Sequence, residues 1–354
     1  MTGTARVLLG LGAVLAVAVA VTAVAPVGGS GDPRVVVHHA PEHYTRRAGH
    51  LTVNVTGELQ GGPGTAHFRL NEGDWRAVPQ GGLRLPGRTF TIEMHPEALQ
   101  LGENCLDFDV EVRKQQEIVE RVCFGYDERA VEVPFHVTWG EDSVLDAQDG
   151  RWETVERNGE WFVRPTPGSE GYDRILLVSG AFAGERRIEL DLVFRGRIDA
   201  PRPFGVGVLP LWGGHPDEPE TFPRRGWIYG LAWYYSIPEG VGAEMATKWG
   251  DGDLDKVGAF RTSVIEPDTR YRLVAEVRRV DDDQNGEGAY LLRTKWWEHG
   301  TENTFSWIEI RDDSGASLPR AEYAVALLAH RAQVEFGEVR VLPLPEGTAE
   351  ERQR

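Results

Sequence analysis

Positive charge is scarce in this chain of 354 residues. Lys and Arg together number 38 against 55 Asp and Glu, which gives a formal net charge of −17 at pH 7. Nucleic acid and anionic lipid are held by basic surfaces, so the charge balance argues against both as partners. Methionine is also rare, and no long stretch shows the periodicity of an amphipathic helix.

Complete catalytic motifs are lacking as well. The chain has no G-x-S-x-G, no H-E-x-x-H and no glycine-rich phosphate loop, the main signatures of hydrolases, metalloproteases and nucleotide-binding proteins. It does have 42 Gly and 21 Pro among frequent β-branched and aromatic residues. This composition predicts an all-β protein of short strands and tight turns, and the missing motifs favour a binding protein over an enzyme.

One long apolar run occurs, at the N-terminus. Arg6 precedes an uncharged segment from Val7 to Ala25, which as a helix would span about 28 Å, close to the thickness of a bilayer core. We expect residues 1–30 to form a hydrophobic helix that is either a signal peptide or an uncleaved signal anchor. Both alternatives export the rest of the chain, secreted or held at the cell surface, and the second makes the membrane a partner.

Cysteine is limited to Cys105 and Cys123, which flank two segments of alternating apolar and polar residues. Folding these segments as a hairpin about Lys114 places residue i opposite residue 228 − i. The pairs expected in this register are Cys105–Cys123, Leu106–Val122, Asp107–Arg121 and Val110–Ile118. The register predicts a disulfide, which agrees with an oxidising compartment; two free thiols are the alternative.

Strand-like segments between Gly, Pro and Asn turns follow the apolar run. Phe90–Met94 is followed by a turn containing Gly102 and Asn104, then by an alternating strand from Leu106 to Val112. Both turn residues tolerate a positive φ. This order resembles bacterial immunoglobulin-like and fibronectin-III-like modules, which implies a β-sandwich over residues 33–131 that acts as a spacer. A single helical turn is expected at Pro96–Leu99.

A second group of segments extends from Trp139 to Leu344. It contains two short strands around Asn158, a long strand Arg187–Phe194, a hairpin ending at Trp297 and a closing strand Val334–Val341. These segments resemble concanavalin A-like lectin/glucanase sandwiches, the jelly-roll family that includes laminin-G-like modules. The resemblance implies a jelly roll over residues 135–344, followed by a flexible tail at 345–354. Because the family contains lectins, hydrolases and adhesion modules, it implies a fold more than a function.

The same family contains glucanases with an E-x-D-x-x-E catalytic strand. Glu189 and Asp191 match the first two carboxylates, but Phe194 stands where the acid/base Glu belongs. Retaining hydrolysis needs that second carboxyl group as proton donor. The strand alternation favours Glu189 and Asp191 as outward-facing residues over a buried apolar row, so no catalytic residue is assigned.

Aromatic residues give the best functional clue, because nine of the eleven Trp follow Gly150. The segment Trp227–Tyr235 is predicted to form a strand with its larger side chains on one face. Further aromatic and basic residues could extend that face. The expected ligand-binding residues are Trp212, Trp227, Tyr229, Trp233, Tyr235, Arg293, Lys295 and Trp297. Aromatic faces stack on sugar rings and their polar tips bind hydroxyls. The alternative is that these rings fill the space between two sheets.

Two acidic loops are candidate calcium sites. Asp281, Asp283 and Asn285 follow the start of an EF-hand loop, but position twelve is Leu292 in place of the bidentate Glu, and a hairpin turn at Asn285-Gly286 explains them equally. Asp251, Asp253 and Asp255 form a second acidic loop.

The histidines are weaker candidates for a functional site. His38, His39 and His43 could bind a metal, although a solvated segment is the simpler interpretation, and His215 and His299 are expected near the aromatic face.

Taken together, the sequence predicts an exported, membrane-proximal carbohydrate-binding or adhesion protein whose partner is a polysaccharide or glycan. The alternatives are an exported glycoside hydrolase of the same fold and a structural protein of the cell envelope without catalysis.

Overall fold

The computed structural model describes residues 33–44, 52–61, 65–79, 88–111, 118–169, 171–198, 202–215, 226–227, 230–237, 242–249, 256–257, 264–280, 289–301, 306–311 and 322–345. These residues form strands, loops and one 3-10 turn, η1 (Pro96–Ala98), at the position expected for a helical turn. The predicted all-β class is therefore confirmed. The apolar run at residues 7–25 and the tail from residue 346 lie outside the described part, in which no helix is long and apolar enough to cross a bilayer.

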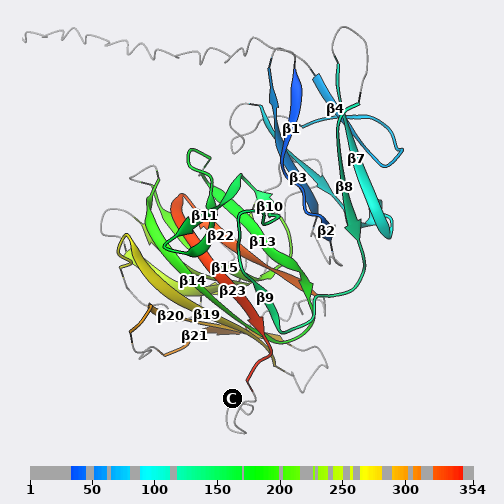
Figure 1. The fold of residues 1–354 in the computed structure, drawn as a ribbon. Coiled ribbons are helices and arrows are strands. Elements are labelled where there is room, and N and C mark those ends of the chain that lie inside the picture. The colour runs from blue at the N-terminus through cyan, green and yellow to red at the C-terminus, as the bar shows by residue number, and fades with distance from the viewer. Residues whose placement is uncertain are drawn as a thin grey trace, which may run out of the picture.

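The first unit is a sandwich of two sheets (Figure 1). One sheet has three strands, in the order β1 (Arg34–His39), β3 (Val53–Gln60) and β6 (Thr89–Met94). The other has five, in the order β2 (His43–Tyr44), β8 (Ile118–Tyr126), β7 (Gly102–Glu111), β4 (Thr65–Leu70) and β5 (Arg76–Ala77). Alternate residues of both sheets, such as Val55 and Phe108, meet in one buried core. The immunoglobulin-like assignment stays a prediction.

The hairpin of β7 and β8 carries the disulfide between Cys105 and Cys123. The register predicted from the sequence holds from Cys105 to Phe108, and Asp107 pairs with Arg121 at 3.1 Å between Oδ2 and Nη2. It does not hold beyond, because a β-bulge after Phe108 places Asp109 opposite Ile118. The predicted pair Val110–Ile118 is therefore wrong: the bulge adds one residue to β8, between Ile118 and Glu120, which alternation alone does not reveal.

The second unit is a larger two-sheet sandwich. Its seven-stranded sheet has the order β10 (Asp146–Asp149), β13 (Asp173–Phe182), β22 (Tyr323–His330), β15 (Phe204–Trp212), β16 (Gly230–Ile237), β17 (Gly242–Trp249) and β18 (Lys256–Val257). Its eight-stranded sheet has the order β11 (Trp152–Arg157), β12 (Glu160–Pro165), β23 (Ala332–Leu342), β14 (Arg186–Arg197), β19 (Thr269–Val280), β20 (Ala289–Glu298) and β21 (Ile308–Arg311), and β9 (Phe135–Val137) pairs with β23. Leucine, valine and aromatic side chains of both sheets fill the space between them.

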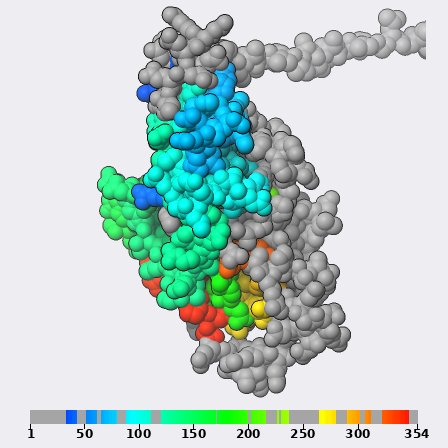
Figure 2. Space-filling view, turned by 90° about the vertical axis from the view of Figure 1, so that its right-hand side faces the viewer, coloured from blue at the N-terminus to red at the C-terminus, as the bar shows by residue number. Residues whose placement is uncertain are grey.

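The two units touch through β3 and β10, and Figure 2 shows the blue and cyan surface of the first against the green surface of the second. Asn54 Nδ2 donates a hydrogen bond to the carbonyl of Gln148 at 3.0 Å, and the backbone N–H of Trp152 donates to His39 Nε2 at 2.9 Å. Burial lowers the pKa of His39 to about 3. The solvated segment expected at His38 and His39 is thus wrong, because the junction between the units covers both side chains.

Candidate functional site

The seven-stranded sheet is apolar on both faces. One face packs on the eight-stranded sheet, with Tyr234 and Ala232 of β16 in the shared core. The opposite face, called here the outer face, carries a second buried cluster that includes Trp212, Trp227 and Trp233. A sheet face turned away from the core of a sandwich is ordinarily polar. The aromatic cluster on the outer face therefore marks it as the place to look for a site.

Strand β16 distributes its residues as the alternation predicts. Leu231 and Trp233 lie in the cluster of the outer face with Tyr235 packed against it, whereas Tyr234 points into the core. Trp227 and Trp233 are only 5% and 7% exposed. Tyr229, which the sequence also predicts on this face, lies outside the described residues. The predicted aromatic residues that the structure describes on this face thus point away from the sandwich core, but Trp227 and Trp233 are not open to solvent.

Two glycines of β15 determine where Trp233 lies. Gly207 is directly opposite Trp233 and Gly205 opposite Tyr235 in the β15–β16 pairing. A Cβ atom on Gly207 would come within 2.6 Å of the Cβ of Trp233, a distance that real side chains do not adopt. The missing side chains make a recess in the sheet surface, and the indole occupies it.

Four rings follow one another along one end of the outer face. The ring of Tyr172 is 4.7 Å from that of His330 in an edge-on arrangement, and His330 is 6.2 Å from Tyr235. Tyr235 stacks on Trp233 with 4.5 Å between centroids and 22° between planes. We call these four residues the ring row. Tyr172 is 39% exposed and Tyr235 half-buried, so the row presents two phenol rings at the surface above a buried indole and imidazole.

Polar groups adjoin the ring row. Nδ1 of His330 is 2.6 Å from Oδ1 of Asp173, and Nη1 of Arg331 is 3.1 Å from Nε2 of His330. Because a guanidinium can only donate, Nε2 accepts in this contact, and Nδ1 is the ring nitrogen that donates to Asp173. Arg331 also lies over the ring of Tyr172, at 4.7 Å from its centroid.

The backbone holds Arg331 in an unusual conformation. Its φ is 48°, in the left-handed region, and its N–H donates to the carbonyls of Gly171 and Tyr172 at 2.7 and 3.1 Å. Residues other than Gly, Asn and Asp seldom adopt this conformation, and such residues concentrate at functional positions. The turn between β22 and β23 thereby places the guanidinium beside the ring row.

The far end of the outer face is closed. Trp212 is fully buried and meets His215 edge-on at 5.0 Å. Nδ1 of His215 is 2.6 Å from the carbonyl of Gly226, and its Nε2 is 3.3 Å from Oδ2 of Asp149. His215 thus lies beside a predicted site residue as expected, but there it belongs to a packed interior.

Arg293, Lys295 and Trp297 lie elsewhere. They belong to β20 of the eight-stranded sheet, where Trp296 points into the core and its neighbours point outward. Arg293 and Lys295 flank Trp307 at 4.3 and 4.5 Å from its ring, and Arg293 Nε is 2.6 Å from Oε2 of Glu276. The structure does not join these three residues to Trp233, so the single platform expected from the sequence is divided between the outward faces of two sheets.

Glu189 and Asp191 lie on that outward face of the eight-stranded sheet, while Leu190, Leu192 and Phe194 are in the core. Arg187 Nε is 2.6 Å from Oε1 of Glu189, and Arg270 Nη2 is 2.7 Å from Oδ2 of Asp191. Asp191 also contacts His299, at 3.5 Å. Arginines surround both carboxylates, which agrees with the outward-facing interpretation of the strand.

The predicted calcium ligands Asp281, Asp283 and Asn285 lie outside the described residues, as does the acidic loop at 251–255. The side chain of His43 is also outside them. Within the part of the chain that the structure describes, no group of three or more His, Cys, Asp or Glu is arranged to hold a metal ion.

Sequence comparison identifies no relative of the chain: no protein-family model and no curated protein matches it. Several solved β-sandwich structures are similar in fold. They include the exoplasmic/lumenal domain of VIP36 in its Ca2+/Man3GlcNAc-bound form (12% identity, 64% of this chain and 95% of that chain, TM-score 0.38). Others are a legume lectin-like domain from Entamoeba histolytica (10%, 56% and 90%, 0.37) and the carbohydrate-binding module CBM66 from Bacillus subtilis (14%, 55% and 91%, 0.34). At these scores the similarity concerns the fold alone and says nothing of a ligand.

Proposed function

We propose that this protein binds carbohydrate at the ring row of the outer face. The observation that carries the proposal is the continuous series of four rings from Tyr172 to Trp233. These rings lie on the sheet face that points away from the core between the two sheets. Phenol rings at the surface offer flat apolar area against which the C–H face of a sugar stacks. Trp233, in its recess, acts as support for Tyr235.

Hydrogen-bonding groups at the row suit the rim of a sugar. Arg331 has donors beyond the one directed at His330, and the hydroxyls of Tyr172 and Tyr235 both donate and accept. A small number of fixed polar groups beside aromatic area is the usual composition of a carbohydrate site. Trp212 and Trp227, named as ligand contacts by the sequence, have a supporting role in this proposal because they are buried.

We also propose that the protein is exported and that the first unit holds the second away from the membrane. The apolar segment Val7–Ala25 and the disulfide between Cys105 and Cys123 support this proposal, since disulfides persist in oxidising compartments.

A glycan array and a polysaccharide pull-down test the binding proposal. The purified chain is compared with Tyr172→Ala, Tyr235→Ala and the control Trp297→Ala, which removes a half-buried aromatic from the opposite face. We expect each tyrosine variant to weaken binding at least tenfold, about 1.4 kcal/mol, and the control to bind as the wild type does. Equal loss in all three variants, or binding to no glycan at all, would rule the proposal out.

A further inference from the structure

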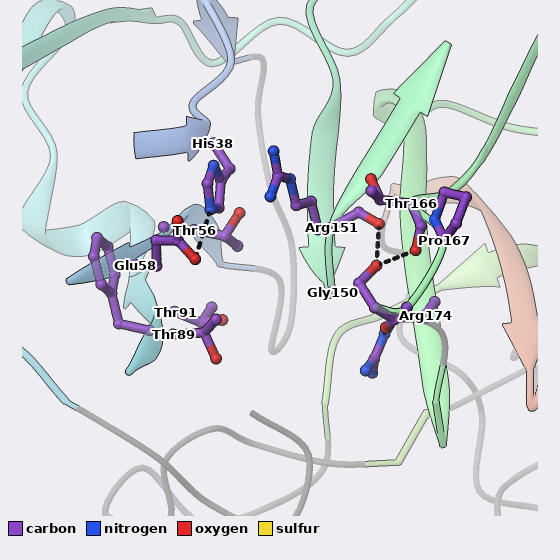
Figure 3. Close-up of a pocket in the computed structure, with 14 residues that line it drawn as sticks. His38, Thr56, Glu58, Thr89, Thr91, Gly150, Arg151, Thr166, Pro167 and Arg174 are labelled. Carbon is purple, nitrogen blue, oxygen red and sulfur yellow. Dashed lines mark hydrogen bonds and ion pairs between the residues drawn. The ribbon is translucent and has the colours of Figure 1, made fainter. Parts of the chain in front are cut away.

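A pocket of about 310 Å³ lies between the two units and shares no residue with the ring row. One wall comes from the three-stranded sheet of the first unit, with His38, Thr56 and Glu58; the other comes from the second unit, with Arg151 and Thr166 (Figure 3). Small-molecule sites commonly measure roughly 300–1,000 Å³. This pocket is at the lower end of that range, which suits a ligand of one or two sugar rings.

Two hydroxyls that line the pocket have no hydrogen-bond partner among the described residues. One is Oγ1 of Thr56, a residue only 5% exposed in β3, and the other is Oγ1 of Thr166 on the facing wall. A buried hydroxyl that makes no hydrogen bond costs stability, so native structures seldom keep one without a reason. Neither oxygen is exposed to the pocket as it stands, so a ligand with hydroxyls or carbonyls to offer would satisfy both once the two threonine side chains turn toward it.

Charged groups of both signs complete the lining. Glu58 lies on the first wall, 3.7 Å from Nε2 of His38, and a hydrogen bond from Gln60 lowers the pKa of Glu58. The exposed side chain of Arg151 lies on the second wall. A carboxylate therefore accepts on one side and a guanidinium donates on the other. A free anion would be repelled by Glu58, and a free cation would be repelled by Arg151. Vicinal hydroxyls both donate and accept, so they match both walls.

The second wall is held in place by its own backbone. The carbonyl of Arg151 accepts hydrogen bonds from the N–H of Thr166 at 2.8 Å and from Oγ of Ser169 at 3.0 Å. Below it, Arg174 packs so closely on Gly150 that a Cβ there would come within 1.9 Å of its Cδ. Contacts between the units at Asn54–Gln148 and His39–Trp152 fix the wall relative to the first unit. The pocket is thus formed before any ligand arrives.

We infer that the junction between the two units is a second ligand site, which takes a small uncharged polyol of the size of a mono- or disaccharide. Bound there, the ligand contacts both units at once and ties them together. This inference does not depend on the ring row, whose residues lie on the outer face of the seven-stranded sheet.

Calorimetric titration of the full chain tests the inference. The neutral probes are glucose, N-acetylglucosamine, maltose and cellobiose, and the charged probes are glucuronate and glucosamine. We expect at least one neutral probe to bind, Thr56→Val and Arg151→Gln to weaken it at least tenfold, and the control Trp297→Ala, outside both proposed sites, to leave it within twofold. The bound probe should also slow amide hydrogen exchange in both walls, at residues 54–58 and 148–152.

The thermal stability of Thr56→Val separates a ligand contact from a structural one. Because the hydroxyl has no partner among the described residues, its replacement by a methyl group should leave the melting temperature unchanged or raise it while binding falls. A lowered melting temperature would show that the hydroxyl stabilises the fold and would count against the site.

Three results would overturn the inference: no neutral probe binding at 10 mM, tighter binding of glucuronate or glucosamine than of the neutral probes, or loss of binding in Tyr235→Ala but not in Thr56→Val. The last result would leave the ring row as the binding site, so the two proposals can fail separately.

Discussion

The indole of Trp233 lies where a side chain on Gly205 would have to go. A Cβ atom on Gly205 would come within 2.7 Å of Cζ3 of the Trp233 ring. Since Trp233 stacks on Tyr235 at 4.5 Å, the depth of the recess also fixes the height of this half-buried phenol ring. A glycine in one strand thus sets the position of an aromatic surface that belongs to the next strand.

Gly205→Ala should displace Trp233 and disturb the ring row. Forcing an extra methyl group into a packed surface costs about 1–3 kcal/mol, and we expect that loss in urea unfolding. Glycan affinity should fall in parallel, because the ring of Tyr235 moves with the indole. Gly140→Ala is the matched control, since a Cβ there has only one neighbour, at 3.9 Å. Equal stability of the two variants would contradict the role given to Gly205.

Arg331→Gly should separate stability from binding. Glycine adopts the φ of 48° without strain, which offsets the lost contacts with His330 and Tyr172, so we expect a change in unfolding free energy within about 1 kcal/mol. Glycan affinity should fall severalfold because the guanidinium is gone. Asn158→Gly, at another left-handed position with φ of 53°, is the control and should leave affinity unchanged. Undiminished affinity in Arg331→Gly would remove Arg331 from the site.

Local patterns predicted the parts of the fold that depend on neighbours in the chain. Alternation alone placed Trp233 and Tyr234 on opposite faces of β16, and the hairpin register matched Cys105 with Cys123. The register failed at the bulge after Phe108, because an inserted residue leaves no mark in the alternation of polar and apolar residues.

The ring row could not be predicted from local patterns. Asp173 and His330 are hydrogen-bonded across 157 positions in the chain, and only the order of strands in the sheet brings them together. The same order explains why Trp297 is separated from Trp233, since β20 and β16 belong to different sheets. A usable signal was the pair Gly205 and Gly207, whose spacing of two marks one face of a strand opposite a bulky residue.

Glu335→Gln should be among the most destabilising single changes on the eight-stranded sheet. The carboxylate is 1% exposed and lies 2.6 Å from Nη2 of Arg195 and 3.0 Å from Nη2 of Arg157. Removing the anion leaves partly exposed guanidinium groups that repel one another, and the loss of charged hydrogen bonds at a buried position costs about 1–3 kcal/mol. Glu153→Gln, whose pair with Arg164 is about one-third exposed, should cost less than about 1 kcal/mol. Urea unfolding of both variants at one salt concentration measures the difference, and similar values would contradict it.

Acid should loosen the junction between the units through His39. Its folded pKa of about 3 lies below the usual 6.5, because burial disfavours the charged ring and because the positive charge of the nearby Arg151 opposes it. Between these two values the unfolded chain binds the proton and the folded chain does not, so stability rises with pH across this window and is lost as pH falls.

From pH 7 to pH 4.5 the loss assigned to His39 is about 2–3 kcal/mol, at 1.36 kcal/mol per pKa unit. His39→Gln keeps an acceptor and cannot titrate, so its unfolding free energy should depend less on pH over this range. The slope that remains then comes partly from His38, whose pKa burial also lowers. If the curves of wild type and His39→Gln run parallel between pH 7 and pH 4.5, the buried imidazole does not control the junction.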